Sequence, residues 1–153
     1  MGLRFMGLIV AGLMLAGLML AGQAQAQVAD LGGAAQGWLS QVRAQDGRGA
    51  LTVSAPLTRA AAAHADDLAG SGRFSHEGSN GSSVGQRVRQ QGYKFCFVAE
   101  NIAKGQGSLQ EVLEGWMASP GHRRNILAEQ AVEFGLVQGP GNLWVMVLGR
   151  PGC

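Results

Sequence analysis

Three histidines and one glutamate are the residues of this chain best suited to chemistry. His64, His76 and His122 are its only histidines. Glu100 follows an apolar run over 95–99, where an ionised carboxylate is costly unless it is paired. Imidazoles and a carboxylate that converge on one cavity would suit Zn²⁺ or another divalent metal. They could equally act as general acid and base.

The same residues have simpler interpretations, which their spacing leaves open. His64 could be a core histidine that hydrogen-bonds to backbone, and Glu100 could cap a turn through the amides of Asn101 and Gly105. The H-x-x-x-H and H-E-x-x-H spacings of helical zinc sites do not occur. A Ser-His-Glu triad that uses Ser75 or Ser119 is conceivable, but the G-x-S-x-G elbow of such hydrolases is missing.

The first 26 residues have a different character from the rest. Arg4 is their only charge, a run rich in Leu, Met, Ala and Gly follows, and Ala24-Gln25-Ala26 ends the segment. This is the pattern of a secretory signal peptide cleaved after Ala26. The apolar run is shorter than the ~20 residues of a membrane span. The sequence therefore predicts a secreted or periplasmic protein without a transmembrane anchor.

Residues 27–153 are predicted to form a single domain. The whole chain has 153 residues, with 12 Lys and Arg against 10 Asp and Glu. A net charge of +2 is too small to indicate nucleic acid as a partner. Both cysteines, Cys96 and Cys153, lie after the cleavage site. Because an exported protein meets an oxidising compartment, we expect them to form a disulfide.

The pattern of apolar residues predicts an α+β fold in which helices cover an antiparallel sheet. His64 shares an apolar stripe with Leu57, Ala61 and Leu68, so we expect it on the buried face of its helix. A capping box at 108–111 should begin a helix, and the turn at 140–142 should join two strands. The expected helices are 30–44, 56–68, 83–91, 109–118 and 122–127, and the expected strands are 93–102, 132–137 and 143–148.

Five segments resemble the CAP superfamily of cysteine-rich secretory, antigen 5 and pathogenesis-related 1 proteins, and they follow one another in the order found in that family. The resemblance is to its bacterial SCP-like extracellular members in particular. Trp116–Leu127 is similar to the bacterial signature W-x-x-S-P-G-H-R-x-N-[IL]-L, and Ala99–Ala103 is similar to the block G-E-N-[IL]-A. The other segments are Leu57–Ala69, Phe74-Ser75-His76, and Arg87 with Gly92-Tyr93.

The resemblance implies an α-β-α sandwich with a small central antiparallel sheet and a cleft lined by two histidines and two acidic residues. His76, Glu100 and His122 match three of these positions. The fourth, a Glu three residues after the Trp in many eukaryotic members, falls on Ser119. The acidic pair is therefore incomplete here. His64, on the helix that flanks the cleft, is the candidate to replace the lost ligand.

We therefore expect a binding module whose cleft holds Zn²⁺ or another divalent metal through His76 and His122. Glu100 would orient or complete the site, with water or His64 in the fourth position. One alternative is a metal-assisted hydrolase of a peptide or cell-envelope polymer, with Glu100 as the candidate catalytic base. Another is a binder of small lipids or sterols, or an interaction scaffold.

Overall fold

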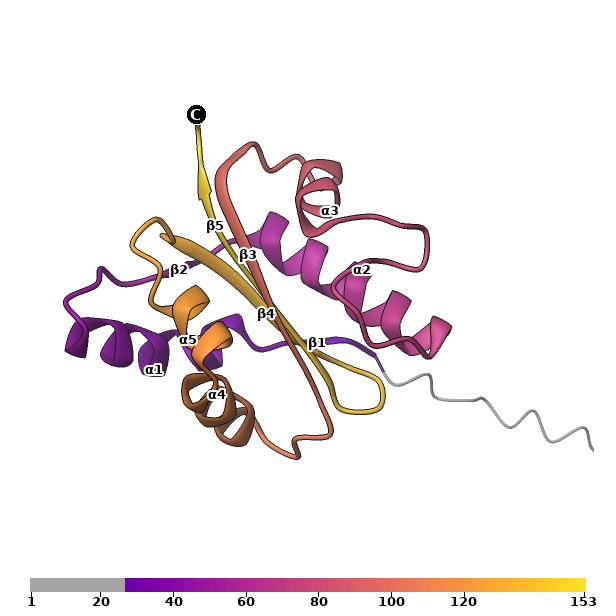
Figure 1. Cartoon of the computed structure of the whole chain (residues 1–153), viewed down its shortest axis with the longest axis horizontal. Helices are drawn as coiled ribbons and strands as arrows, with labels where there is room; N and C mark the ends of the chain where they lie inside the picture. Colours follow the sequence, from indigo (N-terminus) through magenta and orange to yellow (C-terminus); the bar gives the residue numbers. More distant parts are fainter. Residues whose placement is uncertain (1–26) are drawn as a thin grey trace, which may run out of the picture.

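The computed structural model describes residues 27–153. The predicted signal peptide, residues 1–26, and its cleavage site lie outside the described residues. Figure 1 shows the course of the chain. Its elements are β1 (Ala29–Asp30), α1 (Gly32–Gln45), β2 (Thr52–Val53), α2 (Ala55–Ser71), α3 (Val84–Gln90), β3 (Phe95–Lys104), α4 (Leu109–Ala118), α5 (Pro120–Ile126), β4 (Glu133–Gly139) and β5 (Leu143–Pro151).

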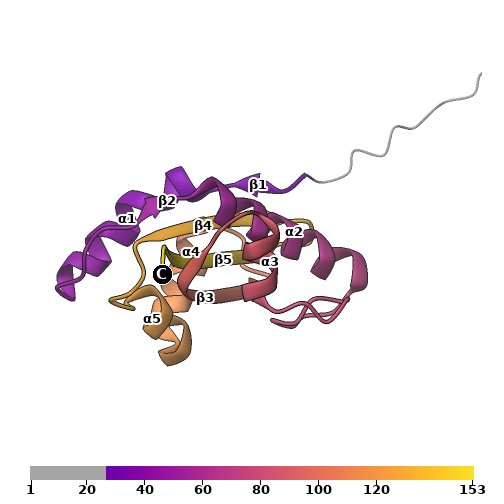
Figure 2. The same cartoon turned by 90° about the horizontal axis from the view of Figure 1, so that it is seen from above.

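A sheet lies between two layers of helices, which confirms the predicted α-β-α sandwich. The sheet has the order β1-β4-β5-β3. α2 and α3 cover one face, while α1, α4 and α5 cover the other (Figures 1 and 2). The three long strands pair antiparallel, but the short β2 pairs parallel with β4. β3 ends the sheet, and no other strand in the described part of the chain pairs with its outer edge.

β5 lies at the centre of the core, because its side chains pack against both layers of helices. Trp144, Met146 and Leu148 belong to the cluster shared with α1, α4 and α5. Val145 and Val147 belong to the cluster shared with α2 and α3. Residues 143–149 are all buried. This continuous apolar run is what a strand covered on both faces requires.

Gly135 of β4 allows α2 to approach the sheet more closely than any side chain would permit. A Cβ at Gly135 would overlap the backbone of Leu57 and Thr58 at the start of α2. The helix therefore rests with its backbone almost directly on β4. Small residues on the same helix, Ala61 and Ala65, are fully buried and complete this contact.

The helices and long strands lie close to the predicted ranges, and the differences are local. β3 begins at Phe95 rather than Tyr93, because the amide of Tyr93 still donates to Val88 O at the end of α3 (3.0 Å). The capping box expected at Ser108 is only half formed, since Glu111 accepts from the amide of Gly107 instead. The strands β1 and β2 were not predicted, because two residues are too few to show an alternating pattern.

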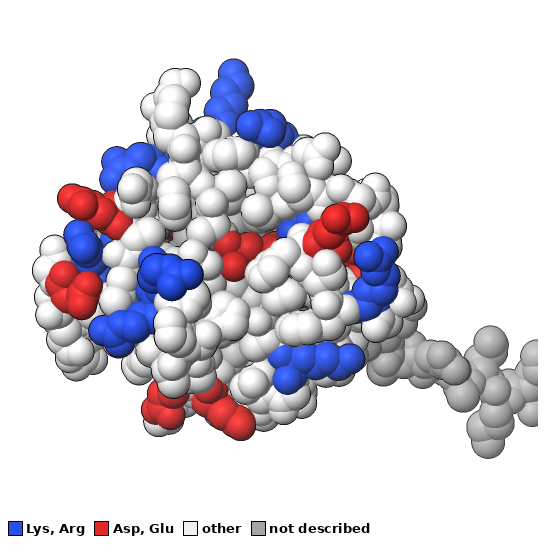
Figure 3. All heavy atoms as spheres, in the orientation of Figure 1, with Lys and Arg blue, Asp and Glu red and all other residues white. Residues whose placement is uncertain are grey.

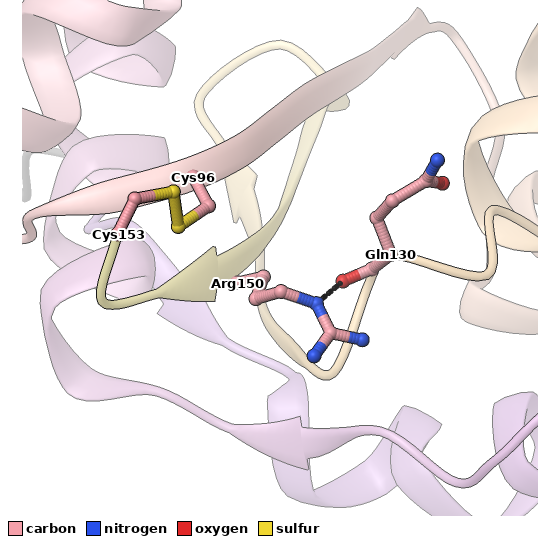
Figure 4. The surroundings of a disulfide bond; sticks show 4 residues. All are labelled: Cys96, Gln130, Arg150 and Cys153. Carbon is pink, nitrogen blue, oxygen red and sulfur yellow. Dashed lines mark hydrogen bonds between the residues drawn. A yellow bond between two sulfur atoms is a disulfide. The ribbon is translucent and has the colours of Figure 1, made fainter.

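The predicted disulfide between Cys96 and Cys153 is confirmed, with Cα atoms 5.2 Å apart (Figure 4). It joins the end of the chain to the start of β3. Nearby, Arg150 Nε donates to Gln130 O (2.7 Å), and the amide of Gly152 donates to Lys94 O (3.0 Å). The carboxyl end of β5 is therefore held by covalent and hydrogen bonds together.

Removing the disulfide should destabilise the fold substantially. The bond closes a loop with a sequence separation of 57, which on the chain-entropy model contributes about 4 kcal/mol. We expect Cys96→Ala combined with Cys153→Ala to lower the free energy of urea unfolding by about this amount. Reductant should destabilise the wild type similarly and leave the double variant unchanged. An unchanged unfolding midpoint would contradict the prediction.

Candidate functional site

Glu100 occupies the middle of β3 and is the buried charge around which the site is built. Its residue is 6% exposed. The Oε2 atom lies 2.7 Å from a guanidinium nitrogen of Arg87, and Oε1 lies 2.9 Å from Nδ1 of His76. Both carboxylate oxygens are thus paired, as a carboxylate in this position requires. Glu100 therefore forms an ion pair and a hydrogen bond to His76, and does not cap a turn, which was the alternative considered from the sequence.

Arg87 connects Glu100 to the loop that carries His76. It comes from α3, whose first turn is fixed by a full capping box between Ser83 and Gln86. Besides Glu100, its guanidinium donates to Ser82 O (2.7 Å) and His76 O (3.1 Å). One buried cation therefore holds both ends of the loop segment that begins at His76. Arg87 entered the sequence analysis only through the family resemblance, since an arginine beside an apolar Val88 gives no sign of a buried partner.

His76 presents one ring nitrogen to solvent, because the other is hydrogen-bonded to Glu100. Nδ1 faces a carboxylate oxygen, so it must carry the proton and donate. This leaves Nε2 as the nitrogen with a free lone pair in the neutral ring. The side chain is 60% exposed. The hydrogen bond to Glu100 raises the pKa of His76 above its usual value, against the opposing effect of partial burial.

His64 lies behind this pair, fully buried on α2 as its apolar stripe predicted. Its Nε2 is 3.0 Å from Ser75 O, so this nitrogen donates, and it is also 3.7 Å from Glu100 Oε1. Burial lowers the pKa of His64 and favours the neutral ring. The remaining nitrogen, Nδ1, is buried and contacts no hydrogen-bonding partner in the described chain. His64 thus holds the backbone next to His76.

His122 lies on α5, on the other side of β3. Its carbonyl accepts from Asn101 Nδ2 (3.1 Å), and Asn125 of the same helix donates to Asn101 Oδ1 (2.8 Å). The imidazole lies beside the ring of Trp116, with centroids 6.4 Å apart. Burial, and then the positive charge of His76, lower the pKa of His122.

Two hollows lie along β3 between these side chains, and we call them together the cleft. The first, of about 390 Å³, is lined by His76, Glu77, Gly81, Ser83, Val84 and Glu100. The second, of about 320 Å³, is lined by Phe74, Ile102, Ala103, Lys104, Gln106, Val112, Gly115, Trp116, Ser119 and His122. Figure 3 shows this face, with acidic and basic atoms side by side inside the hollow at its centre.

The structure places His76 (2.9 Å) and His64 (3.7 Å) beside Oε1 of Glu100. His122 and Ser119 line the second hollow. Within residues 27–153, no three His, Cys, Asp or Glu side chains are grouped closely enough to form a metal site by themselves. The asparagines that anchor α5, Asn101 and Asn125, were not singled out as site residues. Both occur in the family-like segments, but an amide gives no separate signal in the sequence.

Glu100→Gln should destabilise the protein strongly, because it leaves the charge of Arg87 buried without a counter-ion. Breaking a buried ion pair in this way costs about 3–5 kcal/mol, and we expect that loss in urea unfolding. Glu77→Gln is the matched control, because Glu77 is exposed in the same loop. An equal loss of stability in the two variants would show that the pair with Arg87 does not carry the effect.

Comparison with known proteins identifies the family. The chain matches the CAP model, described as the cysteine-rich secretory protein family, over residues 37–142. The uncharacterized protein YkwD of Bacillus subtilis is 32% identical over 94 residues, which are 61% of this chain and 37% of YkwD. The uncharacterized membrane protein YlbC of the same species is 27% identical over 95 residues, 62% of this chain and 28% of YlbC. The chain thus spans well under half the length of these relatives.

Two solved structures have the same fold. An extracellular protein containing a SCP domain from Bacillus anthracis superposes with a TM-score of 0.73 at 24% identity, covering 77% of this chain and 39% of that one. An outer surface protein from Borrelia burgdorferi gives a TM-score of 0.72 at 19% identity, covering 83% of this chain and 99% of that one. No helix among residues 27–153 is long and apolar enough to cross a membrane. The chain belongs to the CAP family of cysteine-rich secretory proteins.

Proposed function

We propose that this CAP protein is an exported binding module whose cleft holds a divalent cation, with Zn²⁺ as the first candidate, between His76 and His122. The observation that carries the proposal is the hydrogen bond from His76 Nδ1 to Glu100 Oε1 (2.9 Å). In the neutral ring, this bond leaves Nε2 without a proton, at the edge of the cleft. A carboxylate behind a histidine is the common arrangement for orienting a metal ligand and raising its basicity.

The donor set fits a cation that is only partly enclosed by protein. Two imidazoles provide two ligands, so water or an oxygen of a bound molecule would complete a tetrahedral site. Ser119 stands where many eukaryotic members of the family have a carboxylate, which makes the site less acidic and weaker. A bound Zn²⁺ would supply a Lewis acid at the cleft. His76 and His122 would hold it, while Glu100 and Arg87 would keep the ring of His76 in place.

The contacts of Glu100 favour binding over metal-assisted hydrolysis. A general base needs a free oxygen within reach of the attacking water. In this chain both oxygens are occupied, by Arg87 and by His76. The glutamate side chain is also 2% exposed. Hydrolysis would require Glu100 to exchange one partner for water, so we assign it a positioning role.

Zinc titration by calorimetry tests the proposal. We expect the wild type to bind Zn²⁺, and His76→Ala and His122→Ala each to abolish the heat, because one imidazole alone is a weak site. Glu100→Gln, in conditions where circular dichroism shows it folded, should weaken binding about 10–100-fold, as for other losses of a carboxylate behind a ligand histidine. Equal heats from the wild type and the double histidine variant would reject the site.

Two substitutions of Ser119 test whether the cation lies next to His122. Ser119→Ala should leave zinc affinity unchanged, because the hydroxyl is not among the proposed ligands. Ser119→Glu should tighten binding, since it adds a carboxylate to the hollow that His122 lines. A tighter Ser119→Glu variant that also loses its affinity on His122→Ala would locate the cation next to both residues. If Ser119→Glu binds no better than Ser119→Ala, the cation does not lie beside His122.

Export is supported by the composition of residues 1–26 and by the relatives described as extracellular or outer-surface proteins. Expression of the full chain in a Gram-negative host should give a mature protein in the periplasm or medium whose N-terminal residue is Gln27. Mass spectrometry of the purified fraction measures this directly. A cytoplasmic protein that retains residues 1–26 would contradict the export proposal.

A further inference from the structure

Basic side chains gather at the turn over residues 126–131, which joins α5 to β4. Among residues 27–153, five arginines and two acidic residues line the hollow at this turn or hydrogen-bond to its backbone. The arginines are Arg43, Arg48, Arg123, Arg124 and Arg150, and the acidic residues are Asp46 and Glu129. Figure 3 shows basic groups around acidic ones at the left of the molecule, where α1 and α5 lie. The turn therefore carries an excess of positive charge.

A hollow of about 500 Å³ lies at this turn, and we call it the arginine hollow. It shares no lining residue with the cleft, although α5 contributes to both. A hollow of this size can hold a whole small molecule. Its lining residues are Asp46, Arg48, Arg123, Arg124, Leu127, Ala128, Glu129 and Gln130.

The two carboxylates do not hold the guanidiniums closely. Arg48 lies 3.3 Å from a carboxylate oxygen of Glu129 and 3.9 Å from one of Asp46. The other oxygen of Asp46 is 3.8 Å from Arg123. Strong hydrogen bonds between such groups are about 2.7–2.9 Å long. None of the ion pairs within residues 27–153 uses Arg124.

Arg43 adds a buried charge next to the arginine hollow. It is 1% exposed, and in the described chain it pairs with no carboxylate. Its guanidinium donates instead to carbonyls of the turn, including Ile126 O (2.6 Å) and Ala128 O (3.0 Å). These carbonyls satisfy its hydrogen bonds but carry no net charge. Burial, and then the positive charge of Arg48, lower the pKa of Arg43, so the two guanidiniums repel each other.

The carboxyl ends of α1 and α5 also lie at the arginine hollow, since the residues that follow them, Asp46 and Leu127, line it. Free carbonyls at a helix end would repel an anion. Here these carbonyls already accept hydrogen bonds. The amides of Asp46 and Arg48 both donate to Arg43 O (3.0 and 2.8 Å), and the guanidinium of Arg43 donates to Ile126 O. The arginines therefore determine the sign of the charge in the hollow.

We infer that the arginine hollow binds a phosphate group, either free phosphate or the phosphate of a small ester. A phosphate group carries a charge of about −1.5 to −2 at pH 7 and three strong acceptor oxygens. Guanidinium groups bind such oxygens in pairs, so one phosphate can engage Arg48, Arg123 and Arg124 together. A carboxylate has one charge and two oxygens, which a single guanidinium satisfies. The inference does not depend on the proposed cation site.

Titration of inorganic phosphate into the ¹⁵N-labelled protein, in EDTA and at constant ionic strength, tests the inference. We expect saturable shifts of the amide signals of residues 46–48 and 123–130. The unfolding temperature should also rise, because a ligand that binds the folded state stabilises it. Acetate at the same concentrations is the control and should give no saturable shift. A second titration with glucose 6-phosphate identifies the source, since tighter binding than that of inorganic phosphate assigns the site to an ester.

Arg124→Gln should bind phosphate about tenfold more weakly than the wild type, because it removes a charged hydrogen-bond donor. Without phosphate its unfolding temperature should be unchanged, since Arg124 takes part in no ion pair of the described chain. Arg59→Gln is the matched control. It removes the same charge from an exposed position on α2 and should leave phosphate binding unchanged.

Asp46→Asn should have the opposite effect and tighten phosphate binding several-fold. It removes the negative charge that lies near both Arg48 and Arg123 and would repel the phosphate. A variant that merely disturbed the end of α1 would bind phosphate more weakly, so the direction of the change separates the two effects.

Four results would overturn the inference. These are the absence of a saturable shift with both phosphate compounds, equal affinities for Arg124→Gln and Arg59→Gln, an Asp46→Asn variant that binds no more tightly, or shifts centred on His76 and His122. Zinc binding without phosphate binding would reject the inference and leave the cation site supported. Phosphate binding in EDTA by a protein that binds no zinc would support the inference and reject the cation site.

Discussion

The buried pair of Glu100 and Arg87 is the interaction on which the cleft depends. A carboxylate at 6% exposure needs a counter-charge, and the guanidinium that pairs with it comes from α3, in a different part of the sequence. Pairing them brings α3 to the edge of the sheet. The same guanidinium donates to the carbonyls of His76 and Ser82. One electrostatic requirement thereby positions a helix, a loop and an imidazole.

Different helices form the two walls of the cleft, one on each side of β3. On one side, α2 and α3 carry His64 and Arg87 and fix the loop that holds His76. On the other, α4 and α5 carry Trp116 and His122, held by the two asparagines. The strand between them supplies Glu100 to one side and Asn101 to the other, because successive side chains alternate across a strand. The adjacent residues Glu100 and Asn101 thus link the walls of the cleft.

Much of this could be predicted from the sequence. Five helices, three long strands and the disulfide followed from periodicity, capping residues and the exported context, since all of these leave local traces. The buried position of His64 followed from its place in an apolar stripe. The segments that resemble the CAP family pointed to His76, Glu100 and His122, and all three line the hollows of the cleft.

The remainder depends on contacts between distant residues. Periodicity does not distinguish the buried Arg87 from the exposed Arg89, because the partner that buries it lies on another element. The tautomer of His76 follows from the atom that Glu100 meets, which spacing does not specify. The short strands β1 and β2 form only because β4 offers them an edge.

The close contact at Gly135 affects the candidate site as well as the core. α2 lies directly on β4 there, and the same helix carries His64, whose ring holds the carbonyl next to His76. The distance between α2 and the sheet therefore affects the position of the His76 imidazole at the surface. A methyl group added at Gly135 would collide with the backbone of α2, so the helix would have to move away from β4 and carry His64 with it.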